Sequence, residues 1–311
     1  MKFDYIKCHG SGNEFVMVDA VSNSLEGVNL AELSRFVCDR NSSVGADGVL
    51  LLVEREGMFG MRMFNPDGSE AEMCGNGIRC VARLAEEKIG RGKFDMFSGG
   101  NIYGITREAD IYPAIPTYGV DLKVRLESAD FGFAKGREQF VSQKIERLDD
   151  KLRWTAINVG NPHIVAEVEE VDFDHLTRLG ERVLELHEEF PKGINVSLVK
   201  VLGANRIFVA TYERGAGITA SCGTAMTSSA TAMALNGRCD YEAVIEVENR
   251  GGAVRCICHK EGGLHTQLVG NASYLSHGVI IADDGDFVCV EKGAYSDEIA
   301  LYNEFLKAKI G

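Results

Sequence analysis

Two short segments of this 311-residue chain begin in the same way, and this internal similarity constrains the fold more than any other feature. Residues 73–82 read Met-Cys-Gly-Asn-Gly-Ile-Arg-Cys-Val-Ala, and residues 221–230 read Ser-Cys-Gly-Thr-Ala-Met-Thr-Ser-Ser-Ala. Each segment follows a predicted strand and a glycine-containing loop, and in each the Cys-Gly pair opens a predicted helix. The simplest organisation is two related halves, each presenting one cysteine, Cys74 or Cys222, at the N-terminus of a central helix.

The rest of the chain is typical of short strands joined by tight turns, with few helices. Glycine is abundant, at 35 residues, and often follows β-rich runs. Helical spacing of apolar residues predicts helices over residues 30–38, 76–88, 176–186, 224–236 and 296–309. Strands are expected at residues 5–8, 14–18, 48–54, 61–64, 155–159, 164–167, 196–202, 206–211, 243–247 and 254–259. The turn-rich stretch 112–116 predicts one half over residues 1–117, completed by residues 275–311, and the other over residues 118–274.

The composition argues against several classes of protein. A formal net charge of −13 does not fit an extended nucleic-acid-binding surface, which would be basic. No run approaches the roughly 18 apolar residues that span a bilayer, and the N-terminal residues lack the apolar stretch of a secretory signal. We therefore expect a cytoplasmic protein with no nucleic-acid or membrane partner. Its nine cysteines should be reduced, and their spacing does not support a structural zinc site.

Cysteines at helix N-termini have a specific chemical use. The unpaired N–H groups and the positive end of the helix dipole stabilise thiolate over thiol, and the same N–H groups can bind a carboxylate. If two such helix ends meet, one carboxylate lies between two thiols. One thiolate can then remove the Cα proton of an amino acid while a thiol on the opposite face delivers a proton. This arrangement predicts a racemase or epimerase, in which the helix ends stabilise the enediolate-like charge.

Polar residues precede each cysteine in turn contexts. Asn65 lies in an Asn-Pro-Asp-Gly stretch and can be explained as the start of a turn. Arg214 can be explained as a surface ion-pair residue. In a functional interpretation, Arg214 offers a planar donor fork for a carboxylate and Glu213 offers an acceptor for an ammonium group.

Eight ordered motifs, spread over almost the full length of the chain, resemble those of the diaminopimelate epimerase family. They include Cys-Gly-Asn-Gly-Ile-Arg-Cys at 74–80, Asn-Val-Gly-Asn-Pro-His at 158–163 and Tyr-Glu-Arg-Gly-Ala-Gly at 212–217, together with residues 9–15, 45–48, 64–70, 195–197 and 221–224. The resemblance implies an α/β (α+β) fold of two pseudo-symmetric halves, each a β-barrel-like sheet wrapped around a central helix, with the site in the cleft between them. It also implies a homodimeric isomerase without pyridoxal phosphate or metal, which converts LL-2,6-diaminopimelate to the meso isomer in lysine and peptidoglycan precursor biosynthesis.

The resemblance also implies roles for particular residues. Cys74 and Cys222 correspond to the two catalytic thiols, and His163 and Glu213 to groups that support their proton transfers. The expected substrate-binding residues are Asn13, Asn65, Asn161, Asn195, Glu213 and Arg214, with the backbones of Gly75, Asn76, Gly223 and Thr224 on the reacting carboxylate. His9 is expected to be structural.

Some positions depart from the common pattern of the family. Ile218 stands where many members have glutamate, so a second acid near Cys222 is missing. Residues 225–227 (Ala-Met-Thr) and 97–101 (Phe-Ser-Gly-Gly-Asn) also differ from the usual runs. Neither thiol is affected, so the reaction type is better supported than the identity of the substrate.

Two other functions remain open at this stage. A related racemase acting on histidine or lysine would keep both thiols and change the distal contacts, whereas the proline-racemase branch usually carries histidine at the position of Asn76. A non-catalytic binding protein or redox sensor could use the same pair of cysteines to form a disulfide. The predicted helix over residues 296–309 is expected to pack on the surface or at a dimer interface, without a part in the chemistry.

Overall fold

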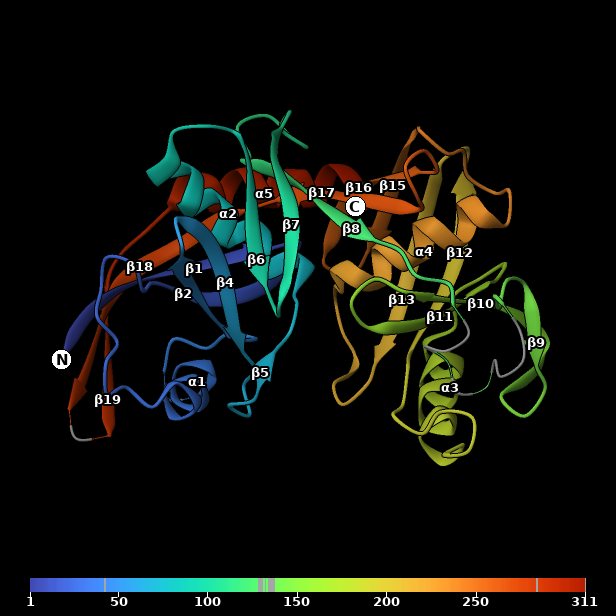
Figure 1. Ribbon diagram of the computed structural model, residues 1–311, viewed down its shortest axis with the longest axis horizontal. Coiled ribbons are helices and arrows are strands. Elements are labelled where there is room, and N and C mark those ends of the chain that lie inside the picture. Colours follow the sequence, from blue (N-terminus) through green and yellow to red (C-terminus); the bar gives the residue numbers. More distant parts are fainter. Residues whose placement is uncertain (42, 128–130, 132, 134–137, 284, 311) are drawn as a thin grey trace. The chain divides into compact units, whose positions relative to one another are not determined.

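The computed structural model describes residues 1–41, 43–127, 131, 133, 138–283 and 285–310. The chain divides into two units, one formed by residues 1–120 and 269–309 and the other by residues 121–268. All five predicted helices are present: α1 (Leu30–Cys38), α2 (Gly75–Ile89), α3 (Phe173–Glu185), α4 (Gly223–Leu235) and α5 (Ser296–Ile310) (Figure 1). Within the described part of the chain, no helix is both long and apolar enough to cross a membrane.

The strands of the first unit form one mixed sheet. They are β1 (Lys2–Gly10), β2 (Asn13–Asp19), β3 (Val49–Arg55), β4 (Met58–Phe64), β5 (Glu70–Ala71), β6 (Lys93–Ser98), β7 (Asn101–Glu108), β8 (Thr117–Lys123), β18 (Ser273–Asp283) and β19 (Asp286–Ala294). Pairing runs from β19 through β18 to β1, β2, β3, β4, β6, β7 and β8. The pairs β2–β3 and β4–β6 are parallel because α1 and α2 provide the crossover connections that parallel neighbours need.

The second unit repeats this connectivity. Its strands are β9 (Gln143–Ile145), β10 (Asp149–Asn158), β11 (Pro162–Glu167), β12 (Asn195–Gly203), β13 (Arg206–Glu213), β14 (Gly217–Ile218), β15 (Val244–Asn249) and β16 (Gly252–His259), followed by β17 (His265–Asn271), which leads into the first unit. The parallel pairs are β11–β12, joined by α3, and β13–β15, joined by α4. Because β1–β2–α1–β3–β4–β5–α2–β6–β7 matches β10–β11–α3–β12–β13–β14–α4–β15–β16, the predicted duplication is confirmed at the level of topology.

One buried helix lies at the centre of each unit. Strands β1, β2, β3 and β4 contact α2, and strands β10, β11, β12, β13, β15 and β16 contact α4. Twelve residues of α4 are buried, from Gly223 to Ala234, and the helix consists of small and flexible side chains such as Ala, Ser, Thr and Met. A helix that is buried on all sides needs no polar face, and small side chains let the strands approach closely. The predicted fold of a sheet wrapped around a central helix is therefore confirmed.

Capping residues fix where the outer helices begin. Asn29 caps α1 by accepting hydrogen bonds from the backbone N–H groups of residues 31 and 32, and Asp172 caps α3 in the same way through residues 174 and 175. The buried face of α1, which includes Leu33 and Val37, packs into a cluster with Val16, Val49 and other apolar side chains of the sheet. Helix α3 belongs to a corresponding apolar cluster of the second unit.

Candidate active site

Cys74 lies where the sequence predicts it, at the N-terminus of α2. Its backbone is extended (φ −141°, ψ 111°), and its sulfur accepts a hydrogen bond from the backbone N–H of Gly77 at 3.3 Å. A Cβ at position 77 would lie 2.8 Å from Cδ2 of Leu50 and 3.5 Å from the Cys74 sulfur. Glycine at this position therefore leaves room for the thiol over the first turn. A donated backbone N–H stabilises negative charge on sulfur.

Two asparagines lie against Cys74. Oδ1 of Asn13 lies 4.0 Å from the sulfur and accepts a hydrogen bond from Nδ2 of Asn76 at 3.3 Å. Asn13 is held from the other side because its Nδ2 donates to Oδ2 of Asp47 at 2.9 Å. Oδ1 of Asn76, which is 1% exposed, accepts a hydrogen bond from Arg79 at 3.0 Å. The structure thus brings together three of the residues predicted for this half of the site, Cys74, Asn13 and Asn76.

Cys222 occupies the matching position at the N-terminus of α4. Its backbone is also extended (φ −129°, ψ 112°), and the backbone N–H of Ala225 faces its sulfur without closing a capping hydrogen bond of normal geometry. Its sulfur lies instead 3.4 Å from Oγ1 of Thr224. Part of the residue is accessible, yet burial around the sulfur raises the pKa of the thiol well above its ordinary value, and the nearby Glu213 carboxylate raises it further. The expectation that the helix N-terminus lowers this pKa is therefore wrong for Cys222, because desolvation and a neighbouring negative charge outweigh the helix end.

Glu213 reaches Cys222 from the end of β13. The carboxylate accepts a hydrogen bond from the thiol, which contributes to the raised pKa. Its Oε1 also accepts a hydrogen bond from the Thr219 hydroxyl at 2.5 Å. Glu213 is the last residue of its strand, and its backbone pairs with Gly217 of β14 in the tight turn that precedes α4. This turn places the carboxylate beside the helix N-terminus.

His163 is fully buried and contacts Thr224, which in turn contacts Cys222. Its Nε2 lies 2.9 Å from Oδ1 of Asn161 and 3.1 Å from Oγ1 of Thr224. Burial lowers the pKa of His163 to about 3, assisted by the positive charge of Arg214, so the ring is neutral at pH 7. Within the described residues, Nδ1 has no hydrogen-bond partner, whereas Nε2 has two oxygen neighbours. The single ring proton therefore belongs on Nε2, where Oδ1 of Asn161 is the closer acceptor and Oγ1 of Thr224 the second oxygen.

Asn195 connects the strand that carries His163 with the turn that carries Arg214. The residue starts β12, is 5% exposed and pairs in parallel register with His163. Its Nδ2 donates to the carbonyl of Pro162 at 3.2 Å, and its Oδ1 accepts the backbone N–H of Arg214 at 2.9 Å. The exposed guanidinium of Arg214 donates to the Lys192 carbonyl at 2.6 Å. These contacts hold in place the segment that carries Glu213 and Arg214.

Asn65 lies in a turn directly after β4. Its backbone N–H donates to the Ser69 carbonyl at 2.8 Å, and its Nδ2 donates to Oγ of Ser69 at 2.9 Å. Oγ of Ser34 on α1 donates to the Asn65 carbonyl at 2.7 Å. The turn interpretation of Asn65 is therefore correct, and its proposed contact with substrate stays a prediction. By topology, this turn corresponds to the Arg214 turn of the second unit.

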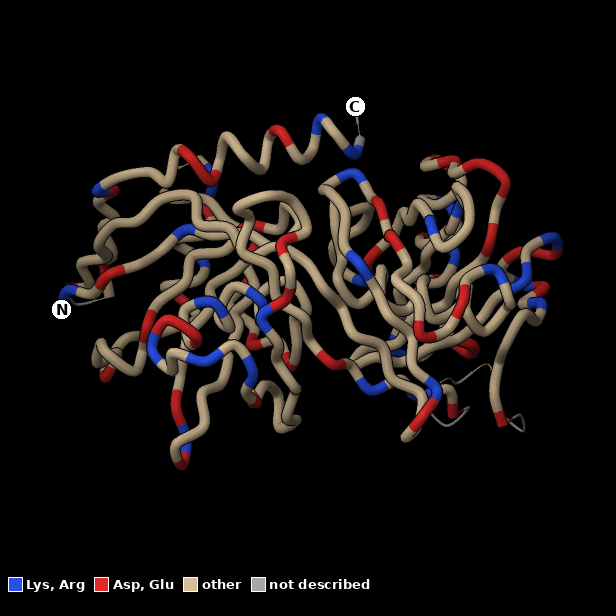
Figure 2. Tube along the Cα trace, turned by 90° about the horizontal axis from the view of Figure 1, so that it is seen from above, with Lys and Arg blue, Asp and Glu red and all other residues tan. Residues whose placement is uncertain are grey.

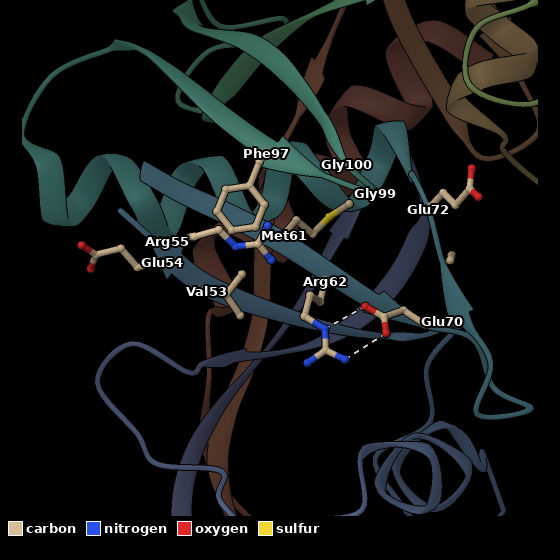
Figure 3. A pocket seen from close by; sticks show the side chains of 11 residues that line it. Val53, Glu54, Arg55, Met61, Arg62, Glu70, Glu72, Phe97, Gly99 and Gly100 are labelled. Atoms are coloured by element: carbon tan, nitrogen blue, oxygen red, sulfur yellow. Dashed lines mark hydrogen bonds and ion pairs between the residues drawn. The ribbon is translucent and has the colours of Figure 1, made fainter. Parts of the chain in front are cut away.

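A separate pocket of about 330 Å³ opens in the first unit beside β3, β4 and β6, and it contains neither thiol (Figure 3). The guanidinium of Arg55 lies over the ring of Phe97 at 5.0 Å, and Arg62 forms two hydrogen bonds with the Glu70 carboxylate at 2.7 and 2.9 Å. The charged side chains of Arg55, Arg62 and Glu70 thus already interact with neighbouring residues of the protein. The reactive side chains lie elsewhere, at the N-termini of α2 and α4.

Three groups that the sequence analysis did not single out support the half-sites. Asp47 anchors Asn13, Thr219 binds Glu213, and the hydroxyl of Thr224 connects His163 with Cys222. Asp47 belongs to a motif quoted for the family resemblance, but nothing in the sequence indicates its partner. In the described part of the chain, no three His, Cys, Asp or Glu side chains are grouped as metal ligands would be. All nine cysteines are free thiols.

Solved structures define the class of fold. A Bacillus anthracis phenazine biosynthesis protein of the PhzF family superposes with a TM-score of 0.65 at 17% identity, covering 91% of this chain and 100% of that one. A hydroxyproline epimerase from Agrobacterium vitis, solved with bound trans-4-hydroxy-L-proline, superposes with a TM-score of 0.63 at 12% identity, covering 93% and 92% of the two chains. The protein thus has the two-unit α/β fold that these proteins share.

Sequence comparison identifies the family within this fold. The profile of the family described as diaminopimelate epimerase matches residues 5–103 and 155–275. A diaminopimelate epimerase from Clostridium acetobutylicum is 34% identical over 315 residues, covering 99% of this chain and 95% of the relative. The chain belongs to the diaminopimelate epimerase family.

Proposed function

We propose that this protein is an isomerase that converts LL-2,6-diaminopimelate to the meso isomer, with Cys74 and Cys222 as its paired acid and base. The observation that carries the proposal is the placement of both cysteines at the N-termini of buried central helices, each within a shell of polar groups. Membership of the family supports the substrate. The product serves lysine and peptidoglycan precursor biosynthesis.

The reaction is a two-base inversion at one carbon. A thiolate takes the Cα proton, and the electron pair of the broken C–H bond moves into the carboxylate, which becomes enediolate-like. The backbone N–H groups of Gly75, Asn76, Gly223 and Thr224 lie in the first helical turns, where they are suited to binding this carboxylate. The second thiol then delivers its proton to the opposite face of Cα and becomes the thiolate, so the two sulfurs exchange roles in each turnover.

The resting proton is assigned to Cys222. Burial and Glu213 raise the pKa of its thiol, and the thiol donates to the Glu213 carboxylate. Both sulfurs face a backbone N–H of the first helical turn, but the Gly77 N–H forms a hydrogen bond of 3.3 Å with Cys74, and the side chain beside Cys74 is the uncharged Asn13. We infer that Cys74 is the base and Cys222 the acid for the isomer that binds first. His163 contacts the Thr224 hydroxyl, which stabilises the thiolate form of Cys222. Asn13, Asn65, Asn161, Asn195, Glu213 and Arg214 are the proposed contacts of the remaining substrate groups.

The first test is deuterium uptake at Cα in D₂O under reducing conditions. LL-diaminopimelate should exchange and invert, whereas histidine, lysine and hydroxyproline should not. Cys74→Ala and Cys222→Ala should each abolish inversion. Exchange confined to another amino acid would move the substrate to a neighbouring racemase, and no exchange with any amino acid would contradict the enzyme proposal.

We also propose that the enzyme works in the cytoplasm as a homodimer. Nine free cysteines fit a reducing compartment. Light scattering coupled to size-exclusion chromatography tests the oligomeric state, and a monomeric mass at the enzyme's working concentration would contradict the dimer.

A further inference from the structure

Helix α5 packs on the first unit through a narrow stripe of side chains. Tyr302 is 5% exposed and Phe305 is fully buried, while most neighbouring positions of the helix are exposed. The Glu298 carboxylate accepts two hydrogen bonds from Arg83 of α2, at 2.7 and 2.8 Å, and one from the backbone N–H of Tyr274 at 3.0 Å. Figure 2 shows α5 as the long helix ending at the C-terminus, with its charged residues spread along it. Helix α5 lies beyond residue 275, where the match to the family profile ends.

Tyr302 contacts a residue at the end of β1. The rings of Tyr302 and His9 meet edge to face, with centroids 4.3 Å apart. His9 is 4% exposed, and burial lowers the pKa of its imidazole to about 4, so the ring is neutral at pH 7. Its Nδ1 accepts a hydrogen bond from the backbone N–H of Gly12 at 3.2 Å, which leaves the ring proton on Nε2. The contact with Tyr302 of α5 therefore fixes the plane of the His9 ring, whose Nδ1 accepts the hydrogen bond from Gly12.

That hydrogen bond stabilises a strained turn. Ser11 and Gly12 connect β1 to β2 with φ values of 54° and 79°, and a non-glycine residue such as Ser11 rarely adopts this left-handed conformation. Such a turn persists only when its surroundings hold it. The Ser11 N–H donates to Oδ1 of Asn271 at 2.7 Å, its hydroxyl accepts from Arg79 at 3.1 Å, and the Gly12 N–H donates to His9. Of these three contacts, that of His9 comes from the ring that packs on Tyr302 of α5, and the Arg79 guanidinium also interacts electrostatically with the Tyr302 phenol.

The turn determines where Asn13 points. Asn13 follows Gly12 immediately, and its Oδ1 lies 4.0 Å from the Cys74 sulfur and 3.3 Å from Nδ2 of Asn76. A rotation of the Ser11–Gly12 peptide would move this oxygen away from both groups. The path from α5 to the thiol thus runs through Tyr302, His9, the turn and Asn13.

We propose that Tyr302 is a positioning residue for the Cys74 half-site, acting through His9 and the Ser11–Gly12 turn, so that α5 is part of the catalytic framework and not only a surface helix. From the sequence alone, this helix is expected to have no part in the chemistry and His9 is expected to be structural. The proposal rests on the proposed function for its kinetic consequence, but its effect on the environment of Cys74 can be measured without turnover.

The test compares Tyr302→Leu with Phe305→Leu. Phe305 lies on the same helix and packs on Tyr112 and Tyr302, at 5.8 and 5.5 Å, so its replacement weakens α5 without removing the ring on His9. Alkylation by iodoacetamide, followed by peptide mass spectrometry, gives the rates at Cys74 and Cys222 in the same sample. Tyr302→Leu should change the ratio of these rates more than threefold and lower kcat/KM about tenfold, because small displacements of positioned groups are costly. Phe305→Leu should leave both within twofold although it also loses apolar packing of α5, because the Tyr302 ring on His9 is kept.

Tyr302→Phe is the conservative variant, and it should restore both values because it keeps the ring. An unchanged alkylation ratio in Tyr302→Leu, or an equal change in Phe305→Leu, would overturn the proposal. If the ratio changes as expected but no amino acid is inverted by the unmodified protein, the positioning inference stands and the proposed function fails.

Discussion

Replacing Thr224 by valine removes one hydroxyl from the line of groups that joins His163 to Cys222. Oγ1 lies 3.1 Å from Nε2 of His163 and 3.4 Å from the Cys222 sulfur, and it lowers the otherwise raised pKa of the thiol. Valine has nearly the same shape, so the first turn of α4 and its backbone N–H groups should remain. The variant therefore isolates the hydroxyl, which must stabilise the sulfur each time Cys222 becomes a thiolate.

The size of the effect follows from the geometry. A hydrogen bond to a charged group contributes about 1.5–3 kcal/mol, and sulfur, as a weaker acceptor than oxygen, favours the lower end of this range. Since about 1.4 kcal/mol corresponds to a factor of ten in rate, kcat should fall roughly tenfold. KM should change little, because the backbone donors of α4 are retained. The basic limb of the pH profile should move to higher pH, because the variant thiol ionises less readily.

Kinetic assays of epimerisation over a range of pH, combined with Cα deuterium exchange, measure these changes. Thr224→Ser keeps a hydroxyl and should stay close to the unmodified protein. Thr227→Val is the matched control, since Thr227 lies one turn further along α4, is fully buried and donates to the Gly223 carbonyl at 2.9 Å. It should lose about 1 kcal/mol of stability without a kinetic effect. A kcat for Thr224→Val within twofold of the unmodified value, with the same pH profile, would refute the reasoning.

Two further predictions concern stability and packing. Gly10→Ala should unfold at a lower temperature and lose activity, because the new Cβ would lie 2.8 Å from the Asn76 carbonyl oxygen. Gly203→Ala is the control and should change neither property, because no atom lies within 4 Å of its new Cβ. Equal melting temperatures of the two variants would contradict this prediction. His9 and His163 have folded-state pKa values of about 4 and about 3, below the unfolded value of about 6.5. The folded protein therefore favours their neutral rings, and this contribution to folding stability is present above pH 6.5 and is lost as pH falls through 4 and 3. Since one pKa unit corresponds to about 1.4 kcal/mol, urea unfolding should show a loss of several kcal/mol over this range, and a flat profile between pH 6.5 and 4 would count against buried neutral imidazoles.

The helices could be predicted from sequence because their signals are local. The predicted bounds of α1 are identical to the observed ones, and those of α2, α4 and α5 agree within one residue. Helix α3 begins three residues earlier than expected, because its start is set by the Asp172 cap and not by the first apolar residue of the periodic pattern. Capping and apolar spacing together thus determine most helix ends in this chain.

Several strands were not predicted, and their surroundings explain why. Strand β19 pairs only with β18 among the described strands, and it packs Phe287 and Cys289 on the core while the apolar Val288 and Val290 are exposed, so its sequence does not show an alternating pattern. Strands β6 and β7 form a hairpin through the Gly99–Gly100 turn, which is easily taken for a loop. Their formation depends on pairing with distant partners, which local spacing does not encode.

The site shows the same division between local and tertiary information. Both thiols could be found from a Cys-Gly pair at a helix start. The contact between His163 and Thr224 joins residues 61 positions apart, and only the parallel and antiparallel pairing of the second unit brings them together. The pKa of Cys222 depends on burial and on Glu213, so the helix-end rule alone gave the wrong direction.

The two half-sites are alike in topology but differ in charge, and this difference bears on the proposed reaction. Glu213 ends β13 immediately before the turn to α4, and the equivalent position of the first unit, which pairs with Ser69 as Glu213 pairs with Gly217, is the uncharged Asn65. Duplication supplies two thiols at two helix ends, but two equivalent thiols would have no reason to differ in protonation. The carboxylate of Glu213 keeps a proton on Cys222, while the side chain beside Cys74 is the uncharged Asn13. In the proposed mechanism this asymmetry sets one sulfur as acid and the other as base before substrate arrives, so that the chain does not have to redistribute protons between the thiols in its first turnover.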